Sequence, residues 1–201
     1  MKKVISMLLA VFIIFAGAMT AAGEKLVTPE ELGQIKKAAD IDPSLTITAK
    51  SAILMERSTG TVLFEHDADK QMPPASITKV MTLLLVFEAM DAGKFAMETE
   101  IVASEHACSM GGSQIWLEPG EVFTVNELLK AAAISSANDA CVALGEAVSG
   151  SEETFVELMN ERAAELGMKN TVFKNCTGLD AEGHLSTARD VAALSCYILN
   201  T

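Results

Sequence analysis

Basic residues are scarce in this 201-residue chain, which has 15 lysines and arginines against 27 aspartates and glutamates. Without Lys2 and Lys3, 13 basic residues remain and the formal charge becomes −14. Such a negative charge argues against nucleic acid and anionic membranes as partners, because both are polyanions. Histidine is also rare, and His66, His106 and His184 are too scattered to have the spacing of metal ligands. The sequence therefore predicts no metal and no cofactor.

The apolar run from Val4 to Phe15 is too short to cross a bilayer as a helix, which takes about 20 residues. Lys2 and Lys3 precede this run and small residues follow it, an order typical of a secretory signal peptide at residues 1–22. An uncleaved membrane anchor is the alternative. We therefore expect the rest of the chain, residues 23–201, to work outside the cytoplasm, associated with the cell envelope.

Four cysteines in a secreted chain allow two disulfides in three connectivities. Cys141 and Cys196 lie among aliphatic residues in helical patterns, where a free thiol packs as a small hydrophobic group. We therefore favour free cysteines. The content of 50% hydrophobic and 21% charged residues is that of one ordinary globular domain.

Apolar periodicity and turn residues predict a chain of the α+β class. Two apolar runs, 52–56 and 61–65, are joined by a turn that contains Gly60, which predicts a β-hairpin. The polar stretch that follows Gly93 is typical of a long, irregular surface segment. Helices are expected over residues 28–40, from Ser76 onward, over 128–134 after a capping box at Thr124 and Glu127, over 139–148 and 152–166, and from Thr187 onward.

Lys79 is the single charged residue between Lys70 and Glu88, inside the apolar helix that we expect to start at Ser76. Residues three apart share a helix face, so the Lys79 amine can reach the Ser76 hydroxyl. Burial pushes a lysine towards the neutral amine, which can accept a proton and activate the alcohol as a nucleophile. The alternative is a lysine that reaches water along a half-buried helix, with Ser76 as a capping residue.

A second polar group follows 60 residues later, where Ser136-Ala137-Asn138 lies at the expected turn between two helices. Ser-x-x-Lys alone occurs by chance in chains of this length. Ser136 and Asn138 are also common helix-capping residue types. The joint occurrence of the two motifs, in this structural context, is what favours a catalytic role.

Together these residues resemble the penicillin-binding protein and serine β-lactamase superfamily, whose motifs are Ser-x-x-Lys, Ser-x-Asn and Lys-Thr-Gly. Class A β-lactamases have Ser-Asp-Asn and a deacylating glutamate, which this chain does not match. The resemblance implies the α+β transpeptidase fold, a helical cluster with an antiparallel sheet of which only the first hairpin is present. The segments similar to low-molecular-mass D-alanyl-D-alanine carboxypeptidases, within residues 49–201, include Gly111-Gly112-Ser113, Asn175-Cys-Thr-Gly-Leu-Asp and His184-Leu-Ser-Thr-Ala-Arg-Asp.

The resemblance also implies a role for each of four residues. Ser76 would attack the terminal D-Ala-D-Ala bond of a peptidoglycan stem peptide, with Lys79 as the base. Ser136 would relay the proton to the leaving amine, and Asn138 would bind the substrate backbone. The helix start at Ser76 would supply one N–H of an oxyanion hole. β-Lactams would act as covalent inhibitors.

The third motif, Lys-Thr-Gly, is missing, because no such sequence follows Ser136. In the family it lies on the strand that faces the nucleophile. We therefore expect residues 23–201 to be an incomplete catalytic domain, inactive and marginally folded when expressed alone, since two strands make no stable sheet. Peripheral membrane association would depend on a missing C-terminal part. The alternative functions are a β-lactamase-like hydrolase and an inactive fragment that binds penicillin or the cell wall.

Overall fold

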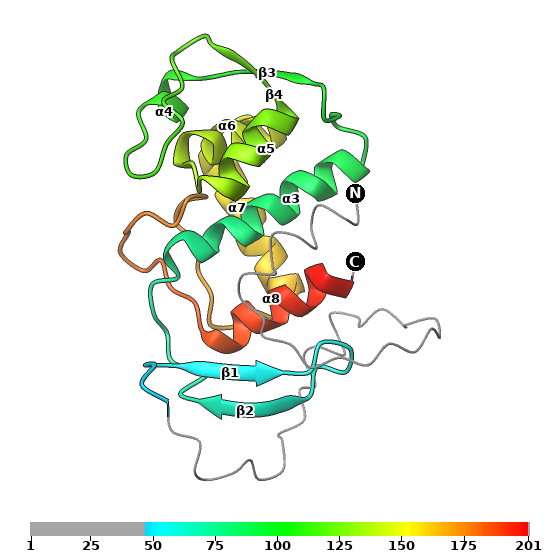
Figure 1. The fold of residues 1–201 in the computed structure, drawn as a ribbon, viewed down its shortest axis with the longest axis vertical. Coiled ribbons are helices and arrows are strands. Elements are labelled where there is room, and N and C mark those ends of the chain that lie inside the picture. Colours follow the sequence, from blue (N-terminus) through cyan, green and yellow to red (C-terminus); the bar gives the residue numbers. More distant parts are fainter. Residues whose placement is uncertain (1–46, 201) are drawn as a thin grey trace. The chain divides into compact units, whose positions relative to one another are not determined.

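The computed structural model describes residues 47–200 of the chain. The signal peptide expected at 1–22 and the helix expected at 28–40 lie outside the described residues. The described chain forms two compact units, one of residues 47–70, 164–169 and 187–200, the other of residues 71–163 and 170–186. In chain order the elements are β1 (Ala52–Met55), β2 (Val62–His66), η1 (Ala75–Thr78), α3 (Lys79–Asp91), β3 (Glu100–Val102), α4 (Glu105–Cys108), β4 (Val122–Thr124), α5 (Val125–Ile134), α6 (Asn138–Ser149), α7 (Glu152–Glu165) and α8 (Ala188–Asn200) (Figure 1).

The first unit contains the predicted β-hairpin and the last helix. β1 and β2 are antiparallel, with Ile53 opposite Glu65, and Gly60 in their connection has φ +67°, a conformation that glycine adopts without strain. α8 begins as its sequence predicts, where Thr187 Oγ1 accepts the N–H of Asp190 at 3.1 Å. The helix packs against β1 (Figure 1).

The second unit is built around α3 and α6, which contact one another, and α5 packs against α6 as well. Large apolar side chains such as Met81, Leu128 and Leu144 are completely buried, and each contributes about 1.5–3 kcal/mol through the hydrophobic effect. No residue from Thr78 to Met90 is exposed. The prediction of a central, buried helix after Ser76 is therefore confirmed.

The predicted helix boundaries in this unit follow from the capping residues. Thr124 Oγ1 accepts the N–H of Glu127, and the Glu127 carboxylate accepts the N–H of Thr124, so the predicted capping box is present. Ser151 Oγ accepts the N–H of Thr154 at the start of α7. Because these side chains satisfy N–H groups that have no partner within the helix, the sequence alone locates both helix starts.

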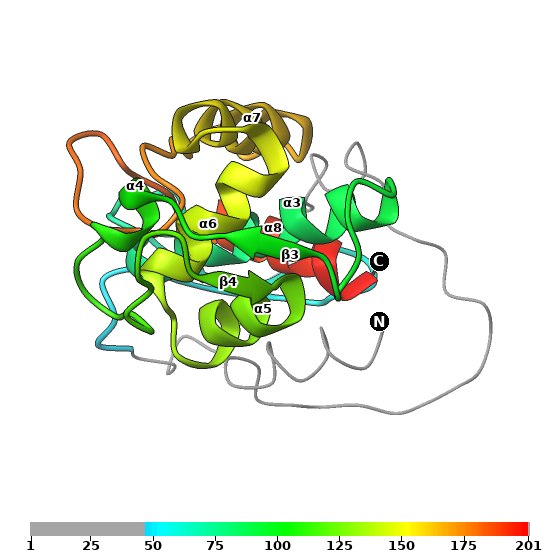
Figure 2. The ribbon, with the colours of Figure 1, turned by 90° about the horizontal axis from the view of Figure 1, so that it is seen from above.

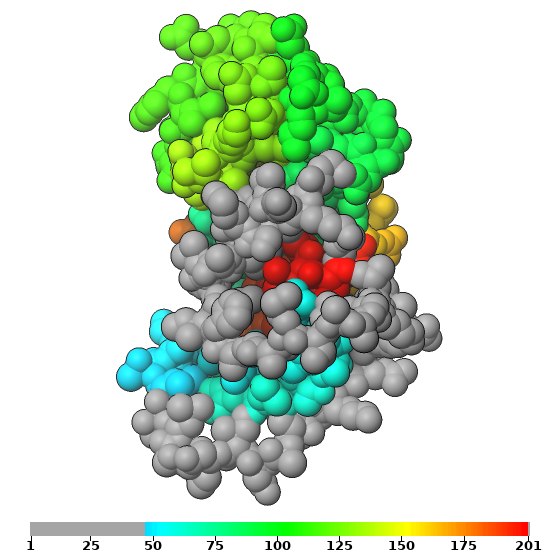
Figure 3. All heavy atoms as spheres, turned by 45° about the vertical axis from the view of Figure 1, so that its right-hand side comes forward, coloured from blue at the N-terminus to red at the C-terminus, as the bar shows by residue number. Residues whose placement is uncertain are grey.

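The segment after Gly93 is not irregular throughout, and in this respect the sequence-based prediction is wrong. β3 and β4 form an antiparallel pair with Ile101 opposite Phe123, in a two-stranded sheet separate from that of β1 and β2. Figure 2 shows β3 and β4 side by side, β3 beside α6 and β4 beside α5. In Figure 3 the green atoms of this segment form a continuous surface. Three-residue strands are too short to show the alternation that predicts a strand.

All four cysteines have free thiols, and those of Cys141 and Cys176 are completely buried. Burial raises the pKa of Cys141 to about 12, because a thiolate is poorly solvated among apolar groups. None of the helices within residues 47–200 has the length and hydrophobicity needed to cross a membrane.

Candidate active site

Ser76 lies in the short 3-10 helix η1 rather than in the first turn of an α-helix. α3 begins only at Lys79, so the predicted helix start is three residues too early. The chain enters η1 through two prolines and through Ala75, whose φ of +49° is uncommon for a residue with a side chain. Ser76 and Lys79 are three residues apart across the junction of η1 and α3, and their side chains lie on the same side.

The predicted contact between the amine and the alcohol is present, with Lys79 Nζ 3.4 Å from Ser76 Oγ. Lys79 is only 5% exposed, whereas Ser76 is open to solvent. Nζ also donates to the backbone oxygen of Thr177 at 2.6 Å, and none of the ion pairs within residues 47–200 includes it. Burial without a counter-charge therefore lowers the pKa of Lys79, which favours the neutral amine.

The segment from Asn175 to Leu179 packs directly against the turn that carries Ser76. Asn175 Oδ1 accepts the N–H of Gly178 at 2.7 Å, and Gly178 has φ +85°. A Cβ atom at Gly178 would lie 1.9 Å from the carbonyl oxygen of Ala75. Only glycine allows the two backbones to approach so closely.

The Asn-Cys-Thr-Gly-Leu sequence of this segment does not by itself predict a role for it. It contacts α3 through main-chain oxygens: that of Thr177 accepts from Lys79, and that of Cys176 accepts from Thr82 Oγ1 at 2.6 Å. Carbonyl oxygens are the same in every residue and leave no signal in a sequence. The single available signal is Gly178, because a glycine after polar residues often marks a tight turn or a close backbone approach.

Ser136 lies at the predicted turn between α5 and α6, with φ +53°. Non-glycine residues in this conformation are strained by about 1–3 kcal/mol and are concentrated at functional sites. Within residues 47–200 the Ser136 hydroxyl makes no hydrogen bond. The Lys79 amine contacts Ser76 and Thr177 instead. The role of Ser136 as a proton relay therefore stays a prediction.

Asn138, in contrast, is 3% exposed and tightly held at the first turn of α6. Its backbone N–H donates to Ser113 O at 2.7 Å, and its Nδ2 donates to Gly111 O at 2.6 Å. A Cβ atom at Gly112 would lie 2.8 Å from this Nδ2, so glycine is needed there too. The structure thus joins the second motif to the Gly-Gly-Ser segment, and the Asn138 amide keeps a second N–H and its oxygen for other partners.

The neighbouring Asp139 is a further residue that sequence analysis missed. Its completely buried carboxylate accepts the N–H groups of Ile115 and Leu117, each at 3.1 Å. Between them, Trp116 has φ +63° and is 76% exposed. A buried acid at a helix start signals a hydrogen-bond partner, but the sequence does not tell which segment provides it.

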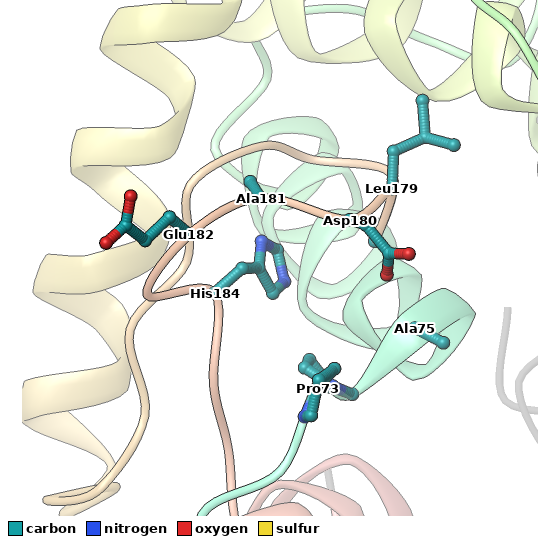
Figure 4. A pocket seen from close by; sticks show the side chains of 9 residues that line it. Pro73, Ala75, Leu179, Asp180, Ala181, Glu182 and His184 are labelled. Carbon is teal, nitrogen blue, oxygen red and sulfur yellow. The ribbon is translucent and has the colours of Figure 1, made fainter.

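A pocket of about 360 Å³ lies beside the turn that carries Ser76 (Figure 4). Residues 73–75 form one side of it, and residues 178–182 with His184 form the other. Within residues 47–200 no three side chains of His, Cys, Asp or Glu gather as metal ligands would. The reactive groups that the structure brings together at this site are the Ser76 hydroxyl and the Lys79 amine.

Residues 35–201 match the D-alanyl-D-alanine carboxypeptidase family, peptidase S11. The chain is 57% identical over 151 residues to the D-alanyl-D-alanine carboxypeptidase DacF of Bacillus subtilis strain 168, an alignment that covers 75% of this chain and 39% of DacF. It is 41% identical over 155 residues to DacC of Escherichia coli K12, covering 74% of this chain and 39% of DacC.

Two solved structures resemble the fold. Penicillin-binding protein 5 of Haemophilus influenzae has a TM-score of 0.76 at 34% identity, covering 80% of this chain and 47% of that protein. The carboxypeptidase DacD of Francisella tularensis has a TM-score of 0.74 at 35% identity, covering 82% of this chain and 40% of that protein. The fold is therefore the α+β fold of the penicillin-binding proteins.

Within that class, the chain belongs to the D-alanyl-D-alanine carboxypeptidase family, as its motifs predicted. It spans 39% of the length of the two curated relatives named above.

Proposed function

We propose that the protein is a serine-type D-Ala-D-Ala carboxypeptidase, which removes the terminal D-alanine from peptidoglycan stem peptides during cell-wall biogenesis. The observation that carries the proposal is the 3.4 Å contact between Lys79 Nζ and Ser76 Oγ. A buried lysine without a carboxylate partner faces an accessible hydroxyl, which is the arrangement of an activated nucleophile. Membership of the family supports the choice of substrate.

In the first step Ser76 Oγ bonds to the carbonyl carbon of the penultimate D-alanine, while the neutral Lys79 amine accepts the hydroxyl proton. The lowered pKa of Lys79 increases the fraction of neutral amine near neutral pH. The 3.4 Å separation is longer than a strong hydrogen bond, and such contacts commonly shorten when substrate binds. A developing negative charge on the carbonyl oxygen would face the N-terminal end of η1 and α3.

In the second step the peptide C–N bond breaks and the proton passes from Lys79 through Ser136 to the nitrogen of the leaving D-alanine. Asn138 holds the substrate backbone through the amide atoms that it does not use internally. Water then attacks the carbonyl carbon of the Ser76 ester and gives a proton to Lys79. As the bond between that carbon and Ser76 Oγ breaks, Lys79 returns the proton to Oγ, and the shortened peptide leaves with a new carboxyl group. A β-lactam ring forms the same ester, but its leaving nitrogen stays attached to the acyl group, which supports covalent inhibition.

The same proposal places the protein outside the cytoplasm, in the cell envelope, where its substrate is found. The order of charged, apolar and small residues in 1–22 supports export by a signal peptide, with 23–201 as the catalytic region. N-terminal sequencing of the exported protein tests this, because retention of residues 1–22 would contradict cleavage.

The activity is tested with a fluorescent penicillin and a peptide that ends in D-Ala-D-Ala. Two proteins are compared: the 201-residue chain, and a chimera that continues it with a segment of the family that carries the Lys-Thr-Gly motif. We expect the chimera to be labelled and to release D-alanine, and Ser76→Ala to abolish both. Ser109→Ala, which changes an exposed serine, is the matched control and should be labelled normally. Label that persists on Ser76→Ala would remove Ser76 as the nucleophile.

The same assay separates the alternative functions. A β-lactamase-like hydrolase would turn over penicillin rapidly, so its acyl-enzyme would be short-lived. A binding fragment would retain penicillin or wall material without releasing D-alanine. Strong labelling of the 201-residue chain by itself would contradict the expectation that this chain alone is inactive.

A further inference from the structure

A buried imidazole links the segment 172–185 to the turn that carries the nucleophile. His184 is 3% exposed, and its Nε2 lies 2.8 Å from Oγ1 of Thr78, the residue before Lys79. Its other ring nitrogen, Nδ1, accepts the backbone N–H of Lys174 at 3.2 Å. In Figure 4 the ring points inward beneath the loop, whereas Glu182 points away from it.

These two contacts determine which tautomer the neutral ring adopts. The backbone N–H of Lys174 can only donate, so Nδ1 must present its lone pair. The ring proton is therefore on Nε2, which donates to Thr78 Oγ1. A protonated ring has an N–H on both nitrogens, and its Nδ1–H would face the N–H of Lys174. Protonation of His184 is thus incompatible with the contact between Nδ1 and the N–H of Lys174.

The surroundings of His184 also oppose a positive charge. Burial, and after it the charge of Lys174, lower the pKa of His184. From α3, Lys79 is a further cation whenever it is protonated. Asp180 and Glu182 line the same pocket from the loop side, but the Glu182 carboxylate is directed away from the ring (Figure 4). The folded protein therefore favours the neutral imidazole.

Main-chain hydrogen bonds hold the backbone that directly follows His184. The N–H of Val172 donates to Leu185 O at 2.8 Å, and that of Leu185 donates back at 3.1 Å. Met72 and Ser186 exchange two further hydrogen bonds, each of 2.9 Å. Because the backbone next to His184 is fixed in this way, a reorientation of the ring changes its contact with Thr78 and is not absorbed by the loop.

We propose that His184 is a positioning residue, whose neutral ring holds Thr78, and with it Ser76 and Lys79, in the arrangement that acylation requires. Protonation of the ring releases the turn. The inference rests on the proposed function, because it assigns His184 to the acylation step. Two groups must then be neutral for full reactivity, Lys79 as the base and His184 as the support of the turn.

NMR of the 201-residue chain tests the hydrogen-bond arrangement independently of activity. We expect the His184 ring to be the Nε2–H tautomer with a pKa below the ordinary histidine value of 6.5. The backbone amide signals of residues 76–79 should shift with that same pKa. In His184→Gln, whose side-chain amide can still donate to Thr78 but does not titrate, they should not shift. An Nδ1–H tautomer would overturn the inference. So would amide signals of residues 76–79 that do not change as the His184 ring titrates.

The pH dependence of penicillin labelling, measured on whichever of the chain and the chimera is labelled, tests the role in acylation. On the acidic side of the profile, the fall in the labelling rate of the unmutated protein should contain two ionisations, and that of His184→Gln only one. His184→Asn can still accept from Lys174 but does not reach Thr78, so labelling should fall about tenfold or more at every pH. Thr78→Val should cause a similar loss, and the double variant little more than either single one.

His106→Gln is the matched control, because His106 is an exposed histidine whose ring contacts Glu152 at 2.7 Å. Its labelling profile should be unchanged. If His184→Gln keeps both ionisations, the inference about His184 fails while the proposed function stands. If neither the unmutated chain nor the unmutated chimera is labelled at any pH, the proposed function fails, and the assignment of His184 to acylation fails with it.

Discussion

Replacement of Gly178 by alanine measures how closely the segment 175–179 supports the turn that carries Ser76. The added Cβ would lie 1.9 Å from the carbonyl oxygen and 2.4 Å from the carbonyl carbon of Ala75, and 3.0 Å from the nitrogen of Ser76. Real Cβ atoms essentially never approach other heavy atoms within 3.0 Å. The obstructing atoms belong to the backbone, so no side chain can rotate away. The turn that carries Ser76 must therefore move.

Two effects contribute to the expected loss of stability in Gly178→Ala. An alanine at φ +85° costs about 1–2 kcal/mol, because its Cβ crowds its own backbone. The added contact with Ala75 costs a further ~1–3 kcal/mol, as overpacking of a filled site does. A shift of Ser76 by about 1 Å would also reduce the rate of penicillin labelling by about 10²-fold.

Gly120→Ala is the matched control, because Gly120 has φ +84° and a Cβ atom there would meet nothing within 4 Å. Gly120→Ala should lose only the stability that an alanine at positive φ costs, and its rate of penicillin labelling should be unchanged. Urea unfolding followed by circular dichroism measures both stabilities, and the difference of about 1–3 kcal/mol reports the contact with Ala75. If the two variants lose the same stability and are labelled at the same rate, the close approach of Gly178 to the turn that carries Ser76 is refuted.

Three further predictions concern single side chains. Lys79→Arg keeps the charge but cannot become neutral, so penicillin labelling of whichever of the chain and the chimera is labelled should fall by about 10²–10⁴-fold, and a rate near normal would exclude Lys79 as the base. Glu56→Gln tests a carboxylate whose pKa is lowered to about 2, chiefly by the Thr59 hydroxyl. Because folding lowers the pKa of Glu56 below its unfolded value of 4.5, the ionised carboxylate stabilises the protein above pH 4.5, and this stabilisation is lost as the pH falls through about 2. In urea unfolding, Glu56→Gln should therefore be less stable than the unmutated protein at pH 7 but not at pH 2. Thr82→Val leaves the Cys176 carbonyl without its donor and should cost about 1–3 kcal/mol, whereas an unchanged melting temperature would contradict this.

Local patterns in the sequence were sufficient to predict most of the elements. The hairpin around Gly60 and the start of α8 at Thr187 were predicted because turn and capping residues act on their immediate neighbours. The same locality explains the errors. β3 and β4 have three residues each, too few for a periodic pattern, and the 3-10 turn at Ser76 packs against Gly178, which is distant in the sequence.

By itself, the sequence determined the chemistry that is available: an amine and an alcohol three residues apart in an apolar helix, and a Ser-Ala-Asn turn. It also determined the family, since those motifs are short and local. Only the tertiary structure decided how the amine is held, because the Thr177 oxygen that accepts from Lys79 lies 98 residues further along the chain. The hydrogen bond between Thr78 and His184 joins residues 106 apart. Such contacts depend on how distant segments pack, and neighbouring residues carry no record of that packing.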